Sequence, residues 1–468
     1  MFPSELKLAK VIPIHKKESK VLCSNYRPIS LLSNIDKILE KLMHSRVYKF
    51  LTKNNLIYPL QFGFRQQHST THALHHLIKS IMNALDDGNF ACGIFVDLQK
   101  AFDTVDHEIL LEKLNHYGIR GLTNNWFKSY LSDRKQYVSI NGFDSSLAKI
   151  TCGVPQGSVL GPLLFLLYIN DLNLAIKSCK VYHFADDTNL LNISNSQKKA
   201  TRLINNDLRN LTNWLNANKI SLNASKTELV FFKPKRKFAN MNLKIKLNKK
   251  RLYSTDSVKY LGIKIDNELN WKKHIDHIAL KLNKANAMLY KLRDFVSPNL
   301  LKSVYYALFE SHLNYACTVW GQNIHTTNRL FILQKKALRT LHFKQRNTHS
   351  NPLFLESEII KFPDKVKIEN CLFVSKYFHN KLPSTFNKWF TFSSNSHKYE
   401  TTFASQGNLK VPSVRTTSYG KSSFTSMAVK TWNDLQKQLK ENAFNAFTPN
   451  KLKAVLQAYF INLYKFFQ

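Results

Sequence analysis

Three aspartates in this sequence have neighbours and spacing that suit metal-assisted chemistry. Asp186 and Asp187 are adjacent within the apolar stretch VYHFADDTNLL, and Asp97 follows the apolar run of GIFVD. Carboxylates on apolar segments are costly unless another group compensates their charge. Mg²⁺ would do so, because it prefers oxygen ligands and is commonly held by one or two carboxylates plus substrate phosphates. Two such ions about 4 Å apart stabilise both oxygens of a phosphoryl displacement.

A second aspartate pair in the chain serves as a comparison. Asp86 and Asp87 lie in NALDDGNF, directly before Gly88. Aspartate followed by glycine is typical of turns. We therefore expect this second pair in a solvated loop, without a role in chemistry.

The elements that position the first three aspartates follow from the hydrophobic pattern. Residues 92–98, CGIFVDL, are apolar with β-branched and aromatic members, which is typical of a buried strand. Residues 181–194 predict a strand, a tight turn at the aspartate pair and a second strand. Between them, residues 153–172 start with a Pro-Gln-Gly turn and continue as a segment that is apolar on every side. This segment predicts a buried helix with Pro162 in its first turn.

The net charge indicates a polyanionic partner. The chain of 468 residues carries 68 Lys and Arg against 31 Asp and Glu, a formal net charge of +37. Self-repulsion on this scale destabilises a compact chain unless an anionic partner relieves it. Aromatic residues make up 12% of the sequence, and their rings suit stacking on single-stranded nucleic acid. A ribosome-like or membrane-surface basic protein is the alternative. The length suggests about three domains.

Cysteine usage and apolar segments bear on the compartment. The six cysteines lie far apart without a CxxC pair, so we expect reduced thiols in an intracellular protein. The most apolar stretch, residues 160–169, is shorter than the about 20 residues that span a bilayer, so no membrane partner is expected. KPKRK at 233–237 is a short basic pattern of the kind found in nuclear localisation signals. Lysines that protect a sheet edge are the alternative explanation.

The composition and the hydrophobic pattern of the sequence change in its C-terminal half. Residues 272–294 and 329–343 each place apolar side chains on one helical face, which predicts basic helices packed as a bundle. After about residue 347, Asn, Ser, Thr and Pro become frequent, and residues 391–418 are expected to be rich in loops. The aromatic residues 456–468 are expected to dock as a final helix. Six cations of the two basic helices are expected to face outward: Lys281, Lys284, Lys291, Lys335, Lys336 and Arg339.

Eight motifs, taken in chain order, resemble the reverse transcriptases of non-LTR (LINE-type) retrotransposons, jockey-like elements in particular. They are VIPIHKK, NYRPISLL, QFGFR, FVDLQKAFDTVDH, GVPQGSVLGPLLF, FADD, LNASKTELVFF and VKYLGIKID. None is decisive by itself, but eight in the correct order form a specific signal, and the resemblance covers nearly all of residues 6–345. The resemblance implies an α+β, right-hand polymerase fold. It would comprise fingers and a palm with an antiparallel sheet at 1–266, a helical thumb at 267–346, and a mostly helical, partly loop-rich C-terminal region at 347–468.

The resemblance also implies an activity. Such a protein is an RNA-directed DNA polymerase, a nucleotidyltransferase that extends a DNA 3′-OH along an RNA template. Its partners would be the RNA template, the DNA primer or target, and deoxynucleoside triphosphates, and no protein partner can be inferred. The implied cofactor is a pair of Mg²⁺ ions, for which Mn²⁺ could substitute.

Matching position by position gives the catalytic roles that the resemblance implies. Asp97, Asp186 and Asp187 would hold the two metal ions, together with the backbone carbonyl of Leu98. Lys226 in NASKTEL would protonate the departing pyrophosphate, a role that suits an ammonium group. The alternative for this lysine is a solvated face.

The same matching implies a nucleotide-binding set. Arg27 and Lys16 would grip the triphosphate, for which arginine supplies a bidentate contact. Phe102 would be a steric gate whose ring blocks a ribonucleotide 2′-OH, with plain core packing as the alternative. Gln156 and Gly157 would lie beside the incoming nucleotide, where glycine permits a close backbone approach, or form only a turn. The primer grip would comprise Tyr260, Leu261 and Gly262.

Some features depart from the family pattern or leave alternatives open. Phe184 stands where many reverse transcriptases carry tyrosine, and no endonuclease or Cys/His zinc knuckle is recognisable, so we expect a fragment or a truncated element copy. A catalytically inactive nucleic-acid-binding relic and a group II intron maturase-like protein are the rival functions. QHSTTHALHHLIKS carries histidines with helical spacing. They are expected on a template-facing helix, with zinc binding as the alternative: His68, His72, His75 and His76.

Overall fold

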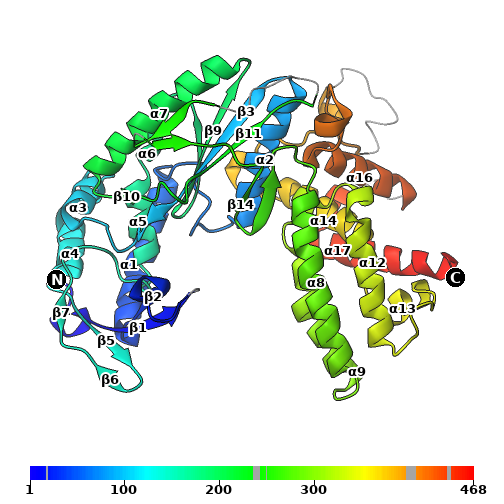
Figure 1. Ribbon diagram of the computed structural model, residues 1–468, viewed down its shortest axis with the longest axis horizontal. Coiled ribbons are helices and arrows are strands. Elements are labelled where there is room, and N and C mark those ends of the chain that lie inside the picture. The colour runs from blue at the N-terminus through cyan, green and yellow to red at the C-terminus, as the bar shows by residue number, and fades with distance from the viewer. Residues whose placement is uncertain (17–18, 236–242, 249, 397–406, 440–443, 468) are drawn as a thin grey trace.

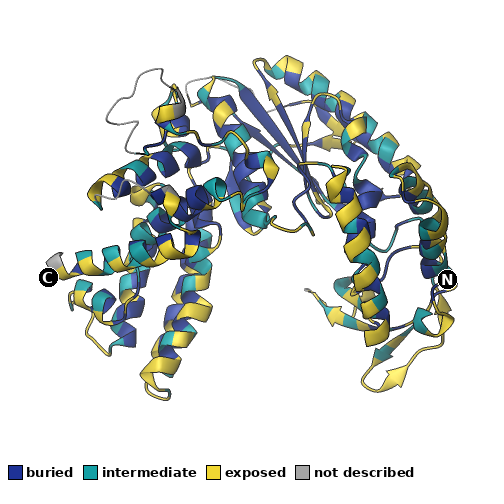
Figure 2. Ribbon diagram, turned by 180° about the vertical axis from the view of Figure 1, so that it is seen from behind, coloured by how far each residue is buried: buried dark blue, intermediate teal, exposed yellow. Residues whose placement is uncertain are grey.

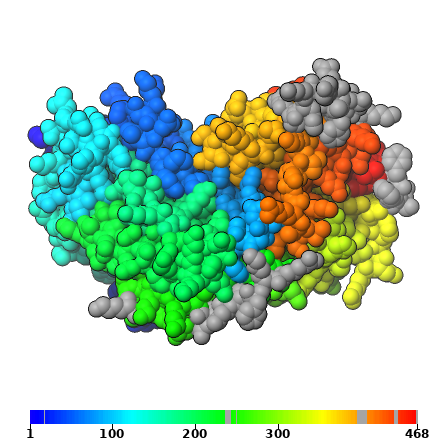
Figure 3. Space-filling view, turned by 90° about the horizontal axis from the view of Figure 1, so that it is seen from above, coloured from blue at the N-terminus to red at the C-terminus, as the bar shows by residue number. Residues whose placement is uncertain are grey.

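A central antiparallel sheet and two diverging arms make up the molecule (Figure 1). The computed structural model describes residues 1–16, 19–235, 243–248, 250–396, 407–439 and 444–467. The N-terminal arm and the helical C-terminal arm extend from opposite ends of the sheet, and from above they form two lobes (Figure 3). The mixture of helices with an antiparallel sheet confirms the predicted α+β fold.

The central sheet has the strand order β11-β3-β9-β8, and every neighbouring pair is antiparallel. Its strands are β3 (Phe90–Val96), β8 (Lys180–Phe184), β9 (Asp187–Ser194) and β11 (Glu228–Phe232). Every residue of β3 is buried, and the central strands appear in dark blue in Figure 2. The predicted buried strand and the predicted hairpin around the aspartate pair are therefore confirmed.

The sheet separates two hydrophobic cores because side chains alternate along each strand. Ile94 packs into one core with the helices on that face, α5 (Gly161–Ile169) and α7 (Gln197–Ala217). Phe95 packs into the other core, with α2 (Thr70–Asp86) and the C-terminal helices. All of α5 except Pro162 is buried, and Pro162 lies in its first turn, as the sequence predicts.

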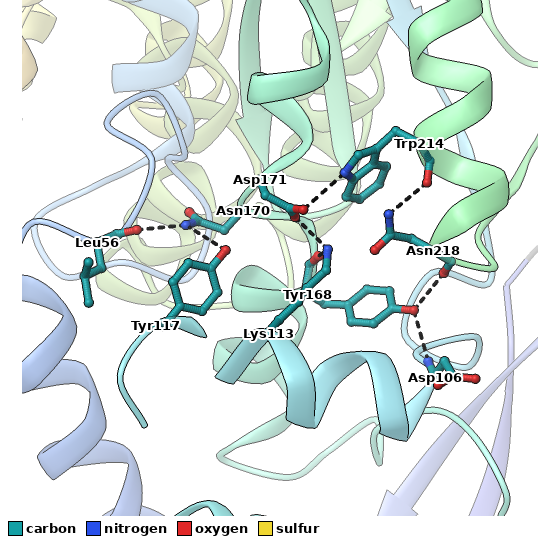
Figure 4. Close-up of polar contacts among 9 residues, drawn as sticks. All are labelled: Leu56, Asp106, Lys113, Tyr117, Tyr168, Asn170, Asp171, Trp214 and Asn218. Atoms are coloured by element: carbon teal, nitrogen blue, oxygen red, sulfur yellow. Dashed lines mark hydrogen bonds and ion pairs between the residues drawn. The ribbon is translucent and has the colours of Figure 1, made fainter. Parts of the chain in front are cut away.

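Polar contacts hold the helices of the first core together (Figure 4). Lys113 of α3 (His107–His116) donates to the Asp171 carboxylate at 2.6 Å and to the carbonyl oxygen of Tyr168 at 2.7 Å. The Asp171 carboxylate also accepts the indole N–H of Trp214, on α7, at 3.3 Å. The Tyr168 hydroxyl donates to the backbone carbonyl of Asn218 at 2.7 Å. These bonds tie α3 and α7 to the C-terminal end of α5.

The N-terminal arm contains a mixed sheet in which β1 pairs antiparallel with β2 and parallel with β5. Its helices are α1 (Asn34–Lys53), which Ser33 caps by accepting the Asp36 N–H, and α4 (Gly121–Leu131). The arm's strands are β1 (Leu8–His15), β2 (Tyr26–Leu31), β5 (Lys135–Ile140), β6 (Phe143–Asp144) and β7 (Ala148–Lys149). Short elements near the central sheet are β4 (Leu98–Gln99), β10 (Ser221–Leu222), α6 (Leu172–Ala175), β12 (Ile245–Leu247), β13 (Lys250–Leu252), β14 (Ser257–Tyr260) and β15 (Ile263–Asp266).

The C-terminal arm is helical, and its two basic helices form as predicted and pack against each other. They are α8 (Lys272–Leu292) and α12 (Ile324–Leu341). The remaining helices are α9 (Pro298–Tyr305), α10 (Ser311–Asn314), α11 (Cys317–Trp320), α13 (Asn351–Glu356), α14 (Phe362–Phe378), α16 (Phe424–Gln438) and α17 (Pro449–Leu463). The predicted final helix is confirmed by α17.

The outward orientation predicted for the cations of α8 and α12 is only partly correct. Lys284, Lys291 and Lys336 are exposed, and Lys281 is half-buried. Lys335 is also half-buried, with its ammonium 4.4 Å from the centre of the Phe331 ring. Arg339 donates from Nε to the carbonyl of Thr348 at 2.8 Å. Lys335 turns toward a ring of its own helix, whereas Arg339 turns back because the following segment folds onto α12, which the helical period alone does not reveal.

His75 and His76 are buried, so the expectation of a template-facing position is wrong for these two, whereas His68 and His72 are half-buried. His75 is 2% exposed, and its Nε2 lies 2.9 Å from the Thr318 hydroxyl. His76 lies with its ring 4.4 Å from the ring of Phe386. Burial lowers the pKa of His76 to about 3, so the ring stays neutral and packs as an aromatic group. Among the described residues these imidazoles belong to no group of three or more metal-ligating side chains.

The second aspartate pair also differs from its expectation. Asp86 is half-buried and ends α2, where its carboxylate accepts the N–H groups of Arg415 at 3.0 Å and Thr416 at 2.7 Å. The Thr416 hydroxyl adds a third bond at 2.6 Å. Asp86 therefore anchors the C-terminal segment to the back of the central sheet, and only Asp87 is exposed. Asp86 and Thr416 are more than 300 residues apart in the sequence, so the local pattern could not predict this contact.

The structure bears on the predictions of reduced cysteine thiols and of no membrane-spanning segment. All six cysteines are free, and four of them are buried. Within the part of the chain that the structure describes, no helix combines the length and the apolarity needed to cross a membrane. Residues 236 and 237 of the basic segment KPKRK lie outside the described residues.

Candidate active site

Strand register brings the three aspartates to one edge of the central sheet. Val96 of β3 lies opposite Thr188 of β9 in an antiparallel pair. Asp97, directly after Val96, and Asp187, directly before Thr188, therefore lie at the same end of the two strands. In the β8–β9 hairpin Phe184 pairs with Asp187, which leaves Ala185 and Asp186 as a two-residue turn. Ala185 has a φ of 56°, in the left-handed region. Asp186 and Asp187, which follow Asp97 by 89 and 90 residues in the sequence, thus lie at the same sheet edge as Asp97.

The carboxylates influence one another electrostatically. Asp186 and Asp187 reach solvent, but the surrounding protein removes much of the water that would stabilise their charge. Burial raises the pKa of Asp187 to about 6, and the carboxylates of Asp186 and Asp97 contribute in the same direction. Burial and Asp97 also raise the pKa of Asp186, while Arg27 and Lys16 act in the opposite direction. The site therefore has an excess of negative charge that a cation would relieve.

The donor set fits a hard divalent cation. Carboxylate oxygens are the ligands that Mg²⁺ prefers, and a cation would compensate the charge of carboxylates whose pKa values are raised by burial and by their mutual repulsion. The described residues include no ready-made group of three or more ligating side chains at metal distance. Mg²⁺ commonly completes its coordination with waters and substrate phosphates, so one or two carboxylates suffice to hold it. Asp97, Asp186 and Asp187 would be its ligands here.

The turn that carries Asp186 is supported by a loop from the N-terminal arm, a contact that the sequence did not reveal. Gln61 is 2% exposed, and its side-chain oxygen accepts the N–H of Gly63 at 2.8 Å and of Ala185 at 3.1 Å. A Cβ on Gly63 would lie 2.3 Å from the Ala185 nitrogen, so only glycine permits this approach. His183 and Phe62 add a backbone bond of 2.8 Å. The motif QFGFR was recognisable in the sequence, but its partner strand was not.

The loop that carries Gln156 and Gly157 is fixed against β2. Gly157 has a φ of 124°, and a Cβ there would lie 2.5 Å from the carbonyl oxygen of Ser30. The Ser30 N–H donates to the Gln156 carbonyl at 2.7 Å, and the Gln156 amide donates to Asp103 at 2.8 Å. Glycine is therefore required at this close approach. The loop therefore lies against the strand β2 that carries Arg27.

Glu40 is a second supporting residue that the sequence did not reveal. Its carboxylate is fully buried and accepts the N–H groups of Val159 and Leu160, immediately before α5. The Tyr130 hydroxyl donates to its other oxygen at 2.5 Å. The signal was present in the spacing of α1, because its two acids share a face with its buried apolar residues: Asp36, Glu40, Val47 and Leu51.

Phe102 lies between the core and the site. Its ring stacks on Phe165 of α5 at 4.5 Å with an interplanar angle of 24°. The exposed Phe64 approaches it edge-on at 6.2 Å. Phe102 is half-buried, so it packs in the core and also presents part of its ring outward.

The three candidate cations differ in placement. Arg27 and Lys16 are exposed on the N-terminal arm, and both act on the charge of Asp186. Lys226 is exposed in the turn between β10 and β11, whose Asn223 N–H donates to the Asp97 carbonyl at 2.9 Å. Among the described contacts, none joins the Lys226 ammonium to a carboxylate. The structure therefore brings two of the three cations toward the aspartates and places the third on a neighbouring turn.

The proposed primer-grip residues form the turn between β14 and β15. Leu261 and Gly262 both have positive φ, 43° and 82°. The Tyr315 hydroxyl donates to the Leu261 carbonyl at 2.6 Å, and its ring covers Gly262. Tyr260 is 4% exposed, and its hydroxyl makes no hydrogen bond within the described residues. Burial, and then the charge of Asp187, raise the pKa of Tyr260, whose ring packs edge-on against Phe95 of β3 at 5.2 Å.

Comparison with known proteins gives a consistent family. Residues 14–265 match the family described as reverse transcriptase (RNA-dependent DNA polymerase). The chain is 32% identical over 362 residues to the "Probable RNA-directed DNA polymerase from transposon BS" of Drosophila melanogaster, covering 73% of this chain and 39% of that protein. It is 30% identical over 381 residues to the "RNA-directed DNA polymerase from mobile element jockey" of the same species, covering 78% of this chain and 41% of that protein. The chain thus spans about two fifths of these relatives.

A solved structure of apo telomerase from Candida tropicalis is similar with a TM-score of 0.45 and 12% identity, covering 83% of this chain and 69% of that one. The family match extends over more than half of the chain and includes all three aspartates. The sequence motifs that resemble non-LTR retrotransposon polymerases agree with the relatives from jockey and BS. The chain therefore belongs to the reverse transcriptase (RNA-dependent DNA polymerase) family.

Proposed function

We propose that this chain is the RNA-directed DNA polymerase of a non-LTR retrotransposon and extends a DNA 3′-OH on an RNA template. The observation that carries the proposal is the meeting of three carboxylates at one sheet edge, opposite two cations of the N-terminal arm. This arrangement suits phosphoryl transfer, in which cations stabilise charge on the transferred group. Deoxynucleoside triphosphates, template RNA and a DNA primer are the proposed substrates and partners.

The proposed catalytic roles are metal binding, triphosphate binding and proton donation. Asp97, Asp186 and Asp187 hold two Mg²⁺ ions, which when bound activate the 3′-OH and stabilise the leaving pyrophosphate. Arg27 and Lys16 bind the triphosphate, and Lys226 donates a proton to the departing pyrophosphate. Mn²⁺ would serve the same ligands.

The remaining site residues would position the substrates. Phe102 excludes the ribonucleotide 2′-OH by bulk, and the loop with Gln156 and Gly157 lies along the incoming nucleotide. The turn of Tyr260, Leu261 and Gly262 sets the primer 3′ end, and the backbone carbonyl of Leu98 helps to hold a metal ion.

The fold divides in a way that suits this function. We propose residues 1–266 as fingers and palm, 267–346 as the thumb and 347–468 as a C-terminal region. The contacts of α14 and α16 with α2 join this last region to the palm's outer face. The segment KPKRK supports a proposal of nuclear localisation.

Primer extension on an RNA template tests the proposal. The purified protein should add deoxynucleotides in the presence of Mg²⁺, and Asp186→Ala should abolish this while leaving primer–template affinity within about twofold. Affinity should persist because Lys and Arg contacts with phosphates supply most of it. Asp87→Ala is the matched control, since Asp87 is exposed in the second aspartate pair.

Three results would count against the proposal. Magnesium-dependent synthesis by Asp186→Ala would refute the metal assignment. Tight primer–template binding by the wild type without any extension would favour an inactive nucleic-acid-binding relic. Intron splicing by the purified protein would favour a maturase-like function.

A further inference from the structure

The hairpin of β14 and β15 depends on contacts outside itself. Its strands form a two-stranded sheet of their own, and Leu261 and Gly262 make the turn between them. A two-stranded hairpin is at best marginally stable by itself in water. Leu261 also carries a Cβ in the left-handed region, with a φ of 43°, which is unfavourable for such a residue. Neighbouring elements must therefore hold this turn in its conformation.

Tyr315 holds the turn from the helical C-terminal arm. It lies between α10 and α11, and its hydroxyl donates to the Leu261 carbonyl at 2.6 Å. A Cβ on Gly262 would lie 3.1 Å from the Tyr315 ring, so the ring packs directly on this glycine. Because a peptide unit is planar, holding the Leu261 carbonyl fixes the orientation of the whole peptide between the two turn residues.

The position of Tyr315 is itself fixed by the core of the helical arm. The buried Trp320 donates from Nε1 to the Tyr315 carbonyl at 2.9 Å. The Trp320 ring packs edge-on against His274 of α8 at 5.1 Å, and His274 Nδ1 accepts the Lys264 N–H of β15 at 3.2 Å. The hairpin is therefore tied to the helical arm both at its turn and on its second strand.

The turn lies beside the candidate active site. Tyr260, directly before the turn, packs on Phe95, which is two residues before Asp97 in the sequence. The hairpin contacts both β11 of the central sheet and α8, at the place where the helical arm joins the sheet (Figure 1). A displacement of the turn would therefore move a group bound there relative to the three aspartates.

We propose that Tyr315 is a positioning residue that sets the primer 3′ end through this turn. The inference rests on the proposed polymerase function, in which Tyr260, Leu261 and Gly262 hold the primer end, and extends it to a residue of the helical arm. Reacting groups must be held closely, because a misplacement of about 1 Å can cost on the order of 100-fold in rate. Loss of the Tyr315 hydroxyl should therefore slow nucleotide addition without weakening the binding of substrates.

Tyr315→Phe tests the proposal, because it removes the hydroxyl and keeps the ring on Gly262. In single-nucleotide addition on a matched primer–template, kcat should fall by about fivefold, as expected for the loss of one hydrogen bond. The KM for the nucleotide and the primer–template affinity should stay within about twofold. A primer with a mismatched 3′ terminus should lose about twofold or less, because its end is already displaced. The ratio of matched to mismatched extension should therefore fall.

A second measurement requires no catalysis. A primer with 2-aminopurine as its 3′-terminal base reports by fluorescence how well that base is stacked, and Tyr315→Phe should raise the signal of the bound complex by about twofold. Tyr306→Phe is the matched control, because it removes the same atom from the same arm at a similar exposure, 42% against 39% for Tyr315. This control should behave as the wild type in both measurements.

Three results would overturn the proposal. The first is an unchanged kcat together with an unchanged fluorescence signal in Tyr315→Phe. The second is an equal loss on matched and mismatched primers, which would assign Tyr315 to stability alone. The third is a raised nucleotide KM with an unchanged kcat, which would assign it to nucleotide binding.

Failure of the polymerase proposal can be told apart from failure of this one. If the wild type adds no nucleotide to any primer, the polymerase proposal fails. The 2-aminopurine signal of the bound primer still shows whether the Tyr315 hydroxyl orders the primer end.

Discussion

The side-chain oxygen of Gln61 accepts the backbone N–H of Ala185 at 3.1 Å, one residue before Asp186. The same oxygen also accepts the N–H of Gly63, so one buried amide joins a loop of the N-terminal arm to the turn that carries Asp186. Ala185 adopts a left-handed conformation, which costs about 1–2 kcal/mol for a residue with a Cβ. A fixed acceptor at this nitrogen helps to keep the turn in that conformation.

Gln61→Ala should therefore reduce extension by about tenfold or more while primer–template affinity stays within about twofold. Two buried N–H groups would lose their acceptor, which also costs about 1–3 kcal/mol of stability. Rates are compared at a temperature at which thermal unfolding shows both proteins fully folded. Gln67→Ala, at an exposed position, is the control, and Gln61→Glu should recover part of the rate because it keeps an acceptor oxygen. If the extension rate falls only in proportion to the fraction of folded protein, Gln61 contributes to stability and not to the geometry of the turn.

Phe102→Ala should admit ribonucleotides far more readily, because the bulk of the ring is the proposed discriminator against the 2′-OH. The measurement is the ratio of deoxynucleotide to ribonucleotide incorporation on one template. Phe165→Leu is the control, since it weakens the same stack but leaves the Phe102 ring in place. An unchanged ratio in Phe102→Ala would assign this residue to the core alone.

Asp36 should make the protein less stable as pH rises from about 4 to about 6. Burial, and then the Glu40 carboxylate, raise the pKa of Asp36 from an ordinary 3.8 to about 6. Over this window the folded state keeps a proton that the unfolded chain has lost, so unfolding becomes easier as pH increases. Asp36→Asn should flatten this part of the profile in urea unfolding at pH 4.5 and 7. Identical slopes in variant and wild type would show that Asp36 is charged throughout, paired with Arg134 at 3.7 Å.

Neutralising three lysines of α8 should weaken the grip on the primer–template duplex. Lys284 and Lys291 are exposed and Lys281 is half-buried. Their replacement by glutamine should lower the salt slope of binding by about 2–3, at roughly 0.7–0.9 per phosphate contact. Products should become shorter, with single-nucleotide addition less affected.

The control for these lysines carries the same charge change on α7 and β12, in Lys198→Gln/Lys199→Gln/Lys246→Gln, all at exposed positions. An unchanged slope and unchanged product length in the α8 variant would mean that its lysines only solvate the helix.

The local elements and the residue types at the candidate site were predictable from the sequence. The apolar run before Asp97, the hairpin around Asp186 and Asp187, and the buried helix after Pro162 all formed as predicted. Each depends on a period of 2 or 3.6 residues or on a nearby turn, so neighbours in sequence are sufficient to specify it. The motif order was likewise enough to indicate the family.

The contacts between side chains that are distant in the sequence became apparent from the folded structure. Nothing in QFGFR shows that Gln61 would bond to a turn 124 residues away, or that Glu40 would hold the N–H groups before α5. His75 and His76 were misplaced for the same reason, since their burial depends on α14 and α16 packing over them. A helical period specifies which face is buried but not what covers it. Long-range packing therefore determined that Gln61 and Glu40 support the site, whereas the local sequence pattern was sufficient to identify the aspartates at its centre.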